Sequence, residues 1–224
     1  MIYPSVCPGR FISRPNRFIA RVELNGVEHT VHVKNTGRCR ELLTPGATVY
    51  LAESDNPARK TRYDLIAVEK GPLLINMDSQ APNRVFGEAA ARLFPGLTHL
   101  KPETVYEDSR FDFYLEAAGR PAFVEVKGVT LEDAGHARFP DAPTQRGIKH
   151  LEGLCRAVEA GYDAFVCFVI QMKGVHAFSP NDLTHPAFGQ ALRRAEACGV
   201  KLMAYDCQVT PNTLILDQPV PILL

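Results

Sequence analysis

The first third of the chain alternates short apolar runs with turn-forming residues. Within each run, apolar and polar positions alternate with the period of two that is typical of half-buried strands. The predicted strands cover residues 17–24, 27–34, 48–52, 64–69 and 73–76. Asn25-Gly26 favours a tight hairpin turn between the first two. With one short helix expected at residues 38–43, this pattern predicts a small β-barrel of the oligonucleotide/oligosaccharide-binding (OB) type, and other small barrels fit nearly as well.

The rest of the chain has helical periods between apolar strands. A composition shift near residues 80–83 marks a junction, so we expect one domain over residues 1–80 and another over residues 81–224. Helices are predicted from a cap at Asn83 to about residue 94, from 144 to about 160, and from 186 to 198. Strands are predicted at 104–107, 111–116, 122–128, 163–172 and 200–205, with a polar connection over 131–141. This order predicts an α/β (α+β) domain, a mixed sheet flanked by helices.

Two of these strands form a predicted hairpin with charge on one face. The period of two sets three apolar side chains together on the opposite face: Phe111, Phe113 and Leu115. A turn at Gly119-Arg120 sets Asp112 opposite Lys127, with Glu125 one diagonal step away. Two carboxylates and an amine are therefore expected on one side of the sheet.

Charge is balanced overall but uneven along the chain. The 25 basic and 25 acidic residues give a formal net charge of zero. Residues 1–78 carry 11 Lys and Arg against 8 Asp and Glu, and the remainder carries 14 against 17, which weakly favours phosphate contacts in the first part. The six cysteines lack Cys-x-x-Cys spacing, and no apolar run is long enough to span a bilayer. We therefore expect a cytoplasmic protein with free thiols and no membrane partner.

A basic loop follows the second predicted strand. Lys34, Arg38 and Arg40 surround Gly37, and such a loop can form a rim that contacts phosphates. The alternative is a solvated loop whose arginines pair with Glu41 or Glu53, and the sequence alone slightly favours it.

The cluster of Asp112, Glu125 and Lys127 carries the strongest chemical signal. Two carboxylates on adjacent strands can share a hard cation such as Mg²⁺ or Mn²⁺, which prefers oxygen ligands. Lys127 could then orient a water molecule or stabilise negative charge in the transition state. The alternative is a cross-strand ion pair that contributes roughly 0.2–1 kcal/mol to stability. The commonest nucleotide-binding and serine-hydrolase motifs are absent from the sequence.

The order of elements around this cluster resembles the PD-(D/E)xK superfamily of metal-dependent nucleases. The whole chain also resembles the sugar fermentation stimulation protein A family. The residues that carry this second resemblance are Asn35-Thr-Gly37, Arg110-Phe-Asp112, Val124-Glu-Val-Lys-Gly128, Thr130-Leu131, Phe139-Pro-Asp-Ala142 and Thr144-Gln-Arg-Gly-Ile-Lys-His-Leu151.

The resemblance implies an N-terminal OB-like barrel, a restriction-endonuclease-like C-terminal domain, and binding to nucleic acid, with DNA as the expected partner. It implies that Asp112 and Glu125 are metal ligands and that Lys127 is the catalytic lysine. It also implies that Glu88 on the first helix is a metal ligand and that Gln145 and Lys149 on the second helix are catalytic site residues. The residues that we expect to contact nucleic acid are Lys34, Arg38, Arg40 and Arg146. The superfamily's Pro-Asp pair is absent, because Phe111 precedes Asp112.

Three functions remain open at this point. The first is a Mg²⁺- or Mn²⁺-dependent nuclease. The second is a catalytically silent DNA-binding regulator of sugar metabolism genes, and the third is a protein-binding module whose acidic cluster is structural. The intact acidic pair and lysine favour the first.

Overall fold

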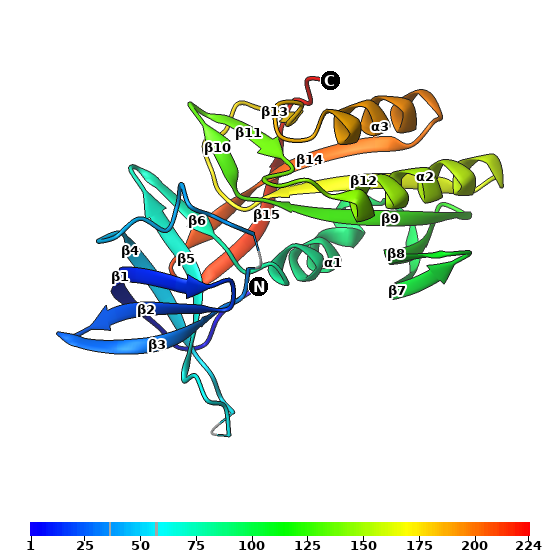
Figure 1. Cartoon of the computed structure of the whole chain (residues 1–224). Helices are drawn as coiled ribbons and strands as arrows, with labels where there is room; N and C mark the ends of the chain where they lie inside the picture. The colour runs from blue at the N-terminus through cyan, green and yellow to red at the C-terminus, as the bar shows by residue number, and fades with distance from the viewer. Residues whose placement is uncertain (36, 57) are drawn as a thin grey trace.

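The computed structural model describes residues 1–35, 37–56 and 58–224. The first six strands form one sheet in the order β3-β2-β1-β4-β5-β6, and a β3–β5 pairing closes β1 to β5 into a barrel (Figure 1). These strands are β1 (Val6–Asn16), β2 (Ile19–Leu24), β3 (Val27–Val33), β4 (Thr48–Glu53), β5 (Tyr63–Lys70) and β6 (Leu73–Asn76). The predicted barrel is confirmed, and β2 turns into β3 at Asn25-Gly26, where both residues have positive φ.

Two features of the barrel differ from the sequence prediction. The sequence pattern does not reveal β1, because Pro8, Gly9 and Pro15 interrupt its alternation. The helix predicted at residues 38–43 is wrong. The chain forms a turn there instead, because Cys39 takes a φ of 45°, outside the helical region.

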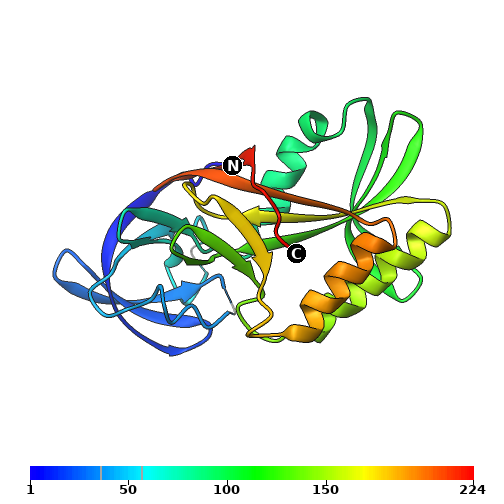
Figure 2. The same cartoon turned by 90° about the horizontal axis from the view of Figure 1, so that it is seen from above.

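The C-terminal half contains a six-stranded mixed sheet in the order β15-β14-β12-β9-β8-β7. Helix α1 (Ala81–Leu93) covers one face, and α2 (Gln145–Glu159) and α3 (Pro186–Ala197) pack together over the other (Figures 1 and 2). The strands are β7 (Leu97–Tyr106), β8 (Ser109–Ala117), β9 (Arg120–Val129), β12 (Asp163–Ile170), β14 (Lys201–Thr210) and β15 (Thr213–Pro219). Strands β9, β12 and β14 run parallel to one another, β8 and β15 pair antiparallel with this group, and β7 pairs antiparallel with β8, which confirms the predicted fold class.

Several elements here exceed the prediction. Strand β7 is longer than the expected 104–107. The sequence pattern does not reveal its first part, because its side chains are mostly solvent-exposed and show no apolar alternation. The predicted polar connection at 131–141 contains β10 (Leu131–Asp133) and β11 (His136–Phe139), which form a small sheet with β13 (Ala177–Pro180). Asn83 does not cap α1. The helix begins two residues earlier with Pro82 in its first turn, which leaves the Asn83 side chain available for another contact.

The barrel and the C-terminal half share one hydrophobic core. Met77 at the end of the barrel belongs to the same buried cluster as Ile170 and Met172 after β12. Ion pairs add to this junction: the Lys70 ammonium lies 2.7 Å from a carboxylate oxygen of Glu132, which is buried on β10. In the part of the chain that the structure describes, no helix combines the length and apolarity needed to cross a membrane.

Candidate active site

The β8–β9 hairpin has a register two residues away from the predicted one. Its turn is Ala118-Gly119, with φ of 49° and 76°, and Ala117 pairs with Arg120. The predicted turn at Gly119-Arg120 is therefore wrong, because alanine here takes a left-handed conformation that it rarely adopts. The ladder ends at the Phe113–Val124 pair, so Asp112 does not pair with Lys127 as predicted. Glu125 and Lys127 are two residues apart on β9, so they share a side of the sheet whatever the register of the hairpin.

The alternation of β8 breaks at Asp112. Phe113 packs in the cluster under α1, whereas Phe111 packs in the large core on the α2 side, so the prediction that they share a face is wrong. The Asp112 carboxylate occupies the gap in the ladder: Val126 donates its backbone N–H to Oδ2 at 2.7 Å, and Asn83 donates to Oδ1 at 2.7 Å. Burial, reinforced by the negative charge of Glu125, raises the pKa of Asp112 above its ordinary value.

Glu125 lies at the centre of the site. Its residue is 2% exposed, and its two carboxylate oxygens have different surroundings. Oε1 accepts hydrogen bonds from Lys127 Nζ at 2.5 Å and from the imidazole of His150, whereas Oε2 is buried and has no partner among the described residues. Burial alone would raise the pKa of Glu125, but the His150 hydrogen bond and the Lys127 charge outweigh it and lower that pKa.

His150 was not singled out from the sequence, and the structure places it beside Glu125. It is buried on α2, and Arg146, one turn earlier, donates its Nε–H to His150 Nε2 at 3.3 Å. Because Nε2 accepts, the proton resides on Nδ1, which donates to Glu125. Gly153 allows α2 to approach the sheet closely, since a Cβ there would lie 2.7 Å from Ser109 Oγ on β8. A lone histidine on a helix carries no sequence signal for such a contact.

The other residues predicted for the site lie outside this cluster. Glu88 forms ion pairs with the N-terminal ammonium at 2.6 Å and with Arg84. Lys149 pairs with Asp108 at 3.2 Å, and Gln145 is exposed at the first position of α2. Within the described residues, no three His, Cys, Asp or Glu side chains lie close enough together to hold a metal ion. The expectation that Glu88 joins Asp112 and Glu125 is therefore wrong, because the N-terminus engages it elsewhere.

The basic residues of the barrel divide into two groups. The Lys34 ammonium lies 2.8 Å from the buried carboxylate of Asp78, so a phosphate contact by Lys34, which stays a prediction, would compete with this ion pair. Arg38 and Arg40 are exposed and line a cavity of about 240 Å³ together with Arg14 and Arg17. Arg14 donates to four backbone carbonyls, those of Arg17, Asn35, Gly37 and Arg38, and thereby fixes this loop. Thr36, part of the Asn35-Thr-Gly37 motif, lies outside the described residues.

Comparisons with known proteins cover nearly the whole chain. Residues 12–77 match the family model described as the SfsA N-terminal OB domain, and residues 80–213 match the sugar fermentation stimulation protein RE domain. A sugar fermentation stimulation protein homolog of Desulfitobacterium hafniense is 60% identical over 215 residues, which are 96% of this chain and 94% of that one. A homolog from Clostridium beijerinckii is 51% identical over 226 residues and covers 100% of both chains.

A solved structure shares the complete fold. Pyrococcus furiosus SfsA in complex with Ca²⁺ superposes with a TM-score of 0.89 at 24% sequence identity, covering 100% of this chain and 98% of that chain. The arrangement of an N-terminal barrel followed by the mixed sheet is therefore common to both.

Proposed function

This chain belongs to the sugar fermentation stimulation protein family, and we propose that it is a divalent-metal-dependent nuclease that hydrolyses phosphodiester bonds in nucleic acid, with DNA as the expected substrate. The observation that carries this proposal is the asymmetric environment of Glu125. One carboxylate oxygen accepts two hydrogen bonds, while the other is buried and has no partner among the residues that the structure describes. A buried polar atom that lacks a partner is rare, and its usual explanation is a bound ion or water.

The donor set fits a hard divalent cation. Asp112 and Glu125 offer carboxylate oxygens, which Mg²⁺ and Mn²⁺ prefer, and the site contains no thiolate. Asp112 and Glu125 Oε2 would hold the ion, with the remaining positions left to water and substrate. When bound, the ion supplies positive charge that neutralises a phosphoryl oxygen. The Ca²⁺ complex of the Pyrococcus relative supports a divalent ion in this fold.

The residues around the carboxylates have distinct roles in this proposal. The Lys127 side chain is 15% exposed, so its ammonium can reach a substrate phosphate while it remains close to Glu125. There it stabilises the negative charge that develops on the phosphoryl oxygens during hydrolysis. His150 and Arg146 hold Glu125 Oε1 in place, which would leave Oε2 free to bind a cation. Gln145 and Lys149 remain predicted site residues, and their exposed positions would require substrate to engage them.

The arginines of the barrel provide a place for the nucleic-acid backbone. Arg14, Arg17, Arg38 and Arg40 surround one cavity, and guanidinium groups form strong bidentate hydrogen bonds with phosphates. We propose that Arg38 and Arg40 contact phosphates of the bound strand, with Arg146 at the entrance to the active site.

A catalytically silent nucleic-acid-binding protein is the second candidate. It is favoured by the absence of a third carboxylate at the site among the described residues. This alternative retains the arginine-lined cavity and predicts that nucleic acid binds equally well after charge removal at Glu125.

The deciding experiment combines metal binding with cleavage. Purified protein is titrated with Mn²⁺ and incubated with single-stranded DNA, double-stranded DNA and RNA, with and without EDTA. We expect Mn²⁺ binding and EDTA-sensitive cleavage, both lost in Asp112→Asn and Glu125→Gln, and cleavage alone lost in Lys127→Met. Glu88→Gln is the matched control, because it removes a carboxylate outside the cluster. Metal-dependent cleavage that persists in Glu125→Gln would refute the mechanism, and DNA binding without any cleavage would favour the silent alternative.

A further inference from the structure

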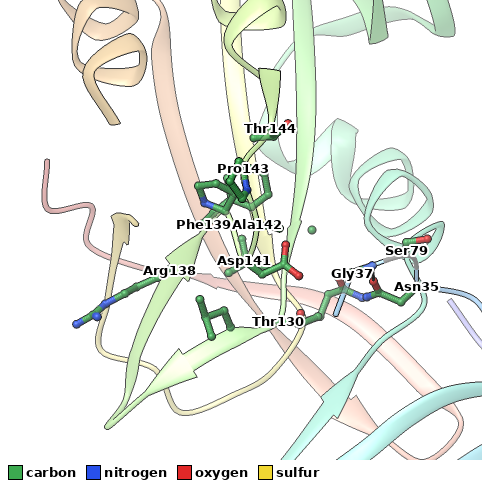
Figure 3. Close-up of a pocket in the computed structure, with 15 residues that line it drawn as sticks. Asn35, Gly37, Ser79, Thr130, Arg138, Phe139, Asp141, Ala142, Pro143 and Thr144 are labelled. Carbon is green, nitrogen blue, oxygen red and sulfur yellow. Dashed lines mark hydrogen bonds between the residues drawn. The ribbon is translucent and has the colours of Figure 1, made fainter. Parts of the chain in front are cut away.

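A cavity of about 340 Å³ with both polar and apolar walls lies between the barrel and the C-terminal sheet (Figure 3). Its walls come from distant parts of the chain: Asn35 and Gly37 from the barrel, Gly128 and Thr130 from the end of β9, and Asp141 and Thr144 from the segment before α2. Ligand pockets typically measure about 300–1,000 Å³, so this volume suits a single small molecule or one nucleotide.

The cavity lies near the candidate active site. Gly128 on its wall immediately follows Lys127, and at about 3.3 Å per residue along a strand it lies roughly 10 Å from Glu125. Thr144 caps α2, the helix that carries His150, and its hydroxyl accepts from the Gly147 N–H at 3.0 Å. A polymer whose phosphate lies at Glu125 can therefore place its neighbouring nucleotide in the cavity.

The cavity also adjoins the arginine-lined cavity of the barrel. Gly37 lines both, so the loop segment at residues 37–40 adjoins both cavities. Arg14 fixes this loop through its bonds to the Asn35 and Gly37 carbonyls, at 2.6 and 2.8 Å. A strand held by Arg38 and Arg40 would thus pass Gly37 on its way to Lys127.

The chemistry of the walls matches a nucleotide. Ser79 lies in the turn before α1 and Thr144 begins α2, so the N-terminal ends of two helices, which favour phosphate, border the cavity. The Asp141 carboxylate points toward Gly37 and lies close to it at one side of the cavity (Figure 3). A Cβ on Gly37 would lie 2.5 Å from Asp141 Oδ2, so only glycine allows this approach. A carboxylate accepts hydrogen bonds from N–H groups on the edge of a base.

We propose that this cavity holds one unpaired nucleotide adjacent to the cleaved phosphodiester, and that Asp141 selects guanine. Guanine presents adjacent N–H donors at N1 and N2, which a carboxylate can accept together, whereas adenine, cytosine and uracil do not offer two such neighbouring positions. This proposal rests on the proposed function, since it takes nucleic acid as the substrate. Unstacked nucleotides are commonly read in this way, by hydrogen bonds to the base edge inside a pocket.

Mononucleotide binding tests the proposal without any cleavage. The full chain in EDTA is titrated with GMP, AMP, CMP and UMP by calorimetry. We expect GMP to bind more tightly than the other three by roughly 5- to 150-fold, the range for one bidentate base contact, and Asp141→Asn to remove this preference. Asp133→Asn, an exposed carboxylate on the neighbouring strand β10, should leave it intact. Equal affinity for all four nucleotides, no binding, or a preference that survives Asp141→Asn would overturn the proposal.

Cleavage mapping separates this proposal from the proposed function. On single-stranded DNA of mixed sequence with Mn²⁺, cuts should concentrate beside guanine in the wild type and spread evenly in Asp141→Asn. Cleavage without GMP binding would refute the proposed nucleotide pocket but not the proposed nuclease activity. Selective GMP binding without any cleavage would refute the nuclease activity but not the nucleotide pocket.

Discussion

Replacing His150 tests whether the active site depends on a residue that contacts no metal or substrate. The His150 imidazole donates from Nδ1 to Glu125 Oε1 and accepts from Arg146 at Nε2. In His150→Ala, Glu125 loses the His150 hydrogen bond, one of the two interactions that compensate for the burial of its negative charge. Hydrogen bonds to charged groups contribute about 1.5–3 kcal/mol, so we expect a loss of unfolding free energy of that size.

The same substitution should weaken metal binding. Partners that orient a metal ligand typically affect metal affinity by about 10- to 100-fold, which corresponds to about 1.4–2.7 kcal/mol. We therefore expect the Mn²⁺ dissociation constant, measured by calorimetry, to rise by this factor in His150→Ala. Urea unfolding of the same samples reports the stability change separately.

Two amide variants distinguish positioning from packing. The asparagine amide nitrogen occupies nearly the position of Nδ1, whereas the glutamine amide corresponds to Nε2. Because Glu125 contacts Nδ1, His150→Asn should restore most of the Mn²⁺ affinity and His150→Gln should not. If all three variants lose stability but bind Mn²⁺ as the wild type does, His150 is only a structural residue and the reasoning is refuted.

The remaining predictions concern other parts of the molecule. Lys70→Met leaves the buried Glu132 carboxylate without its cation, which should cost about 3 kcal/mol of unfolding free energy in urea. Lys70 and the Gly135 N–H outweigh the effect of burial and lower the pKa of Glu132. The stability that this ion pair contributes is therefore complete above pH 4.5 and is lost as the pH falls through the lower pKa of the folded state. A difference in unfolding free energy between wild type and Lys70→Met that stays constant from pH 7 to pH 3 would contradict this. Arg38→Ala combined with Arg40→Ala should reduce the salt slope of DNA binding in anisotropy titrations by about 2 on double-stranded DNA, equally for all sequences; an unchanged slope would exclude phosphate contacts. Gly153→Val should lower the melting temperature, because its side chain would collide with β8. Gly161→Ala should lower the melting temperature by less, because its site is open and only its positive φ is unfavourable for alanine.

The sequence predicts the barrel and the mixed sheet because their signals are local. Asn25-Gly26 specifies a turn by backbone conformation alone, and the apolar run of β12 identifies a strand covered on both faces. Strands whose alternation is interrupted or exposed, such as β1 and β7, give no such signal. The hairpin register also escapes prediction, because it depends on Ala118 adopting positive φ.

The candidate site is predictable only in part. The period of two places Glu125 and Lys127 on one face of β9, whereas Asp112 lies at a break in the alternation of β8, where it accepts the Val126 N–H, and no sequence pattern predicts that contact. The partners of Glu88 and Glu125 lie far away in sequence, at Met1 and His150, and only the tertiary fold specifies them. Lys34 likewise appears as a free basic residue in the sequence and pairs with Asp78, 44 positions away, at the junction.

The polar network at this junction has a consequence for how the chain can be divided. Asn76 donates to Tyr3, Gln171 of the C-terminal half donates to Asn76 and to the Asp78 carbonyl, and Asp78 binds Lys34. A cut at residue 79 would expose these groups and the apolar surface around Met77 together. The two family domains are therefore not exchangeable modules: the barrel excised alone should aggregate, and the intact chain should melt in a single calorimetric transition.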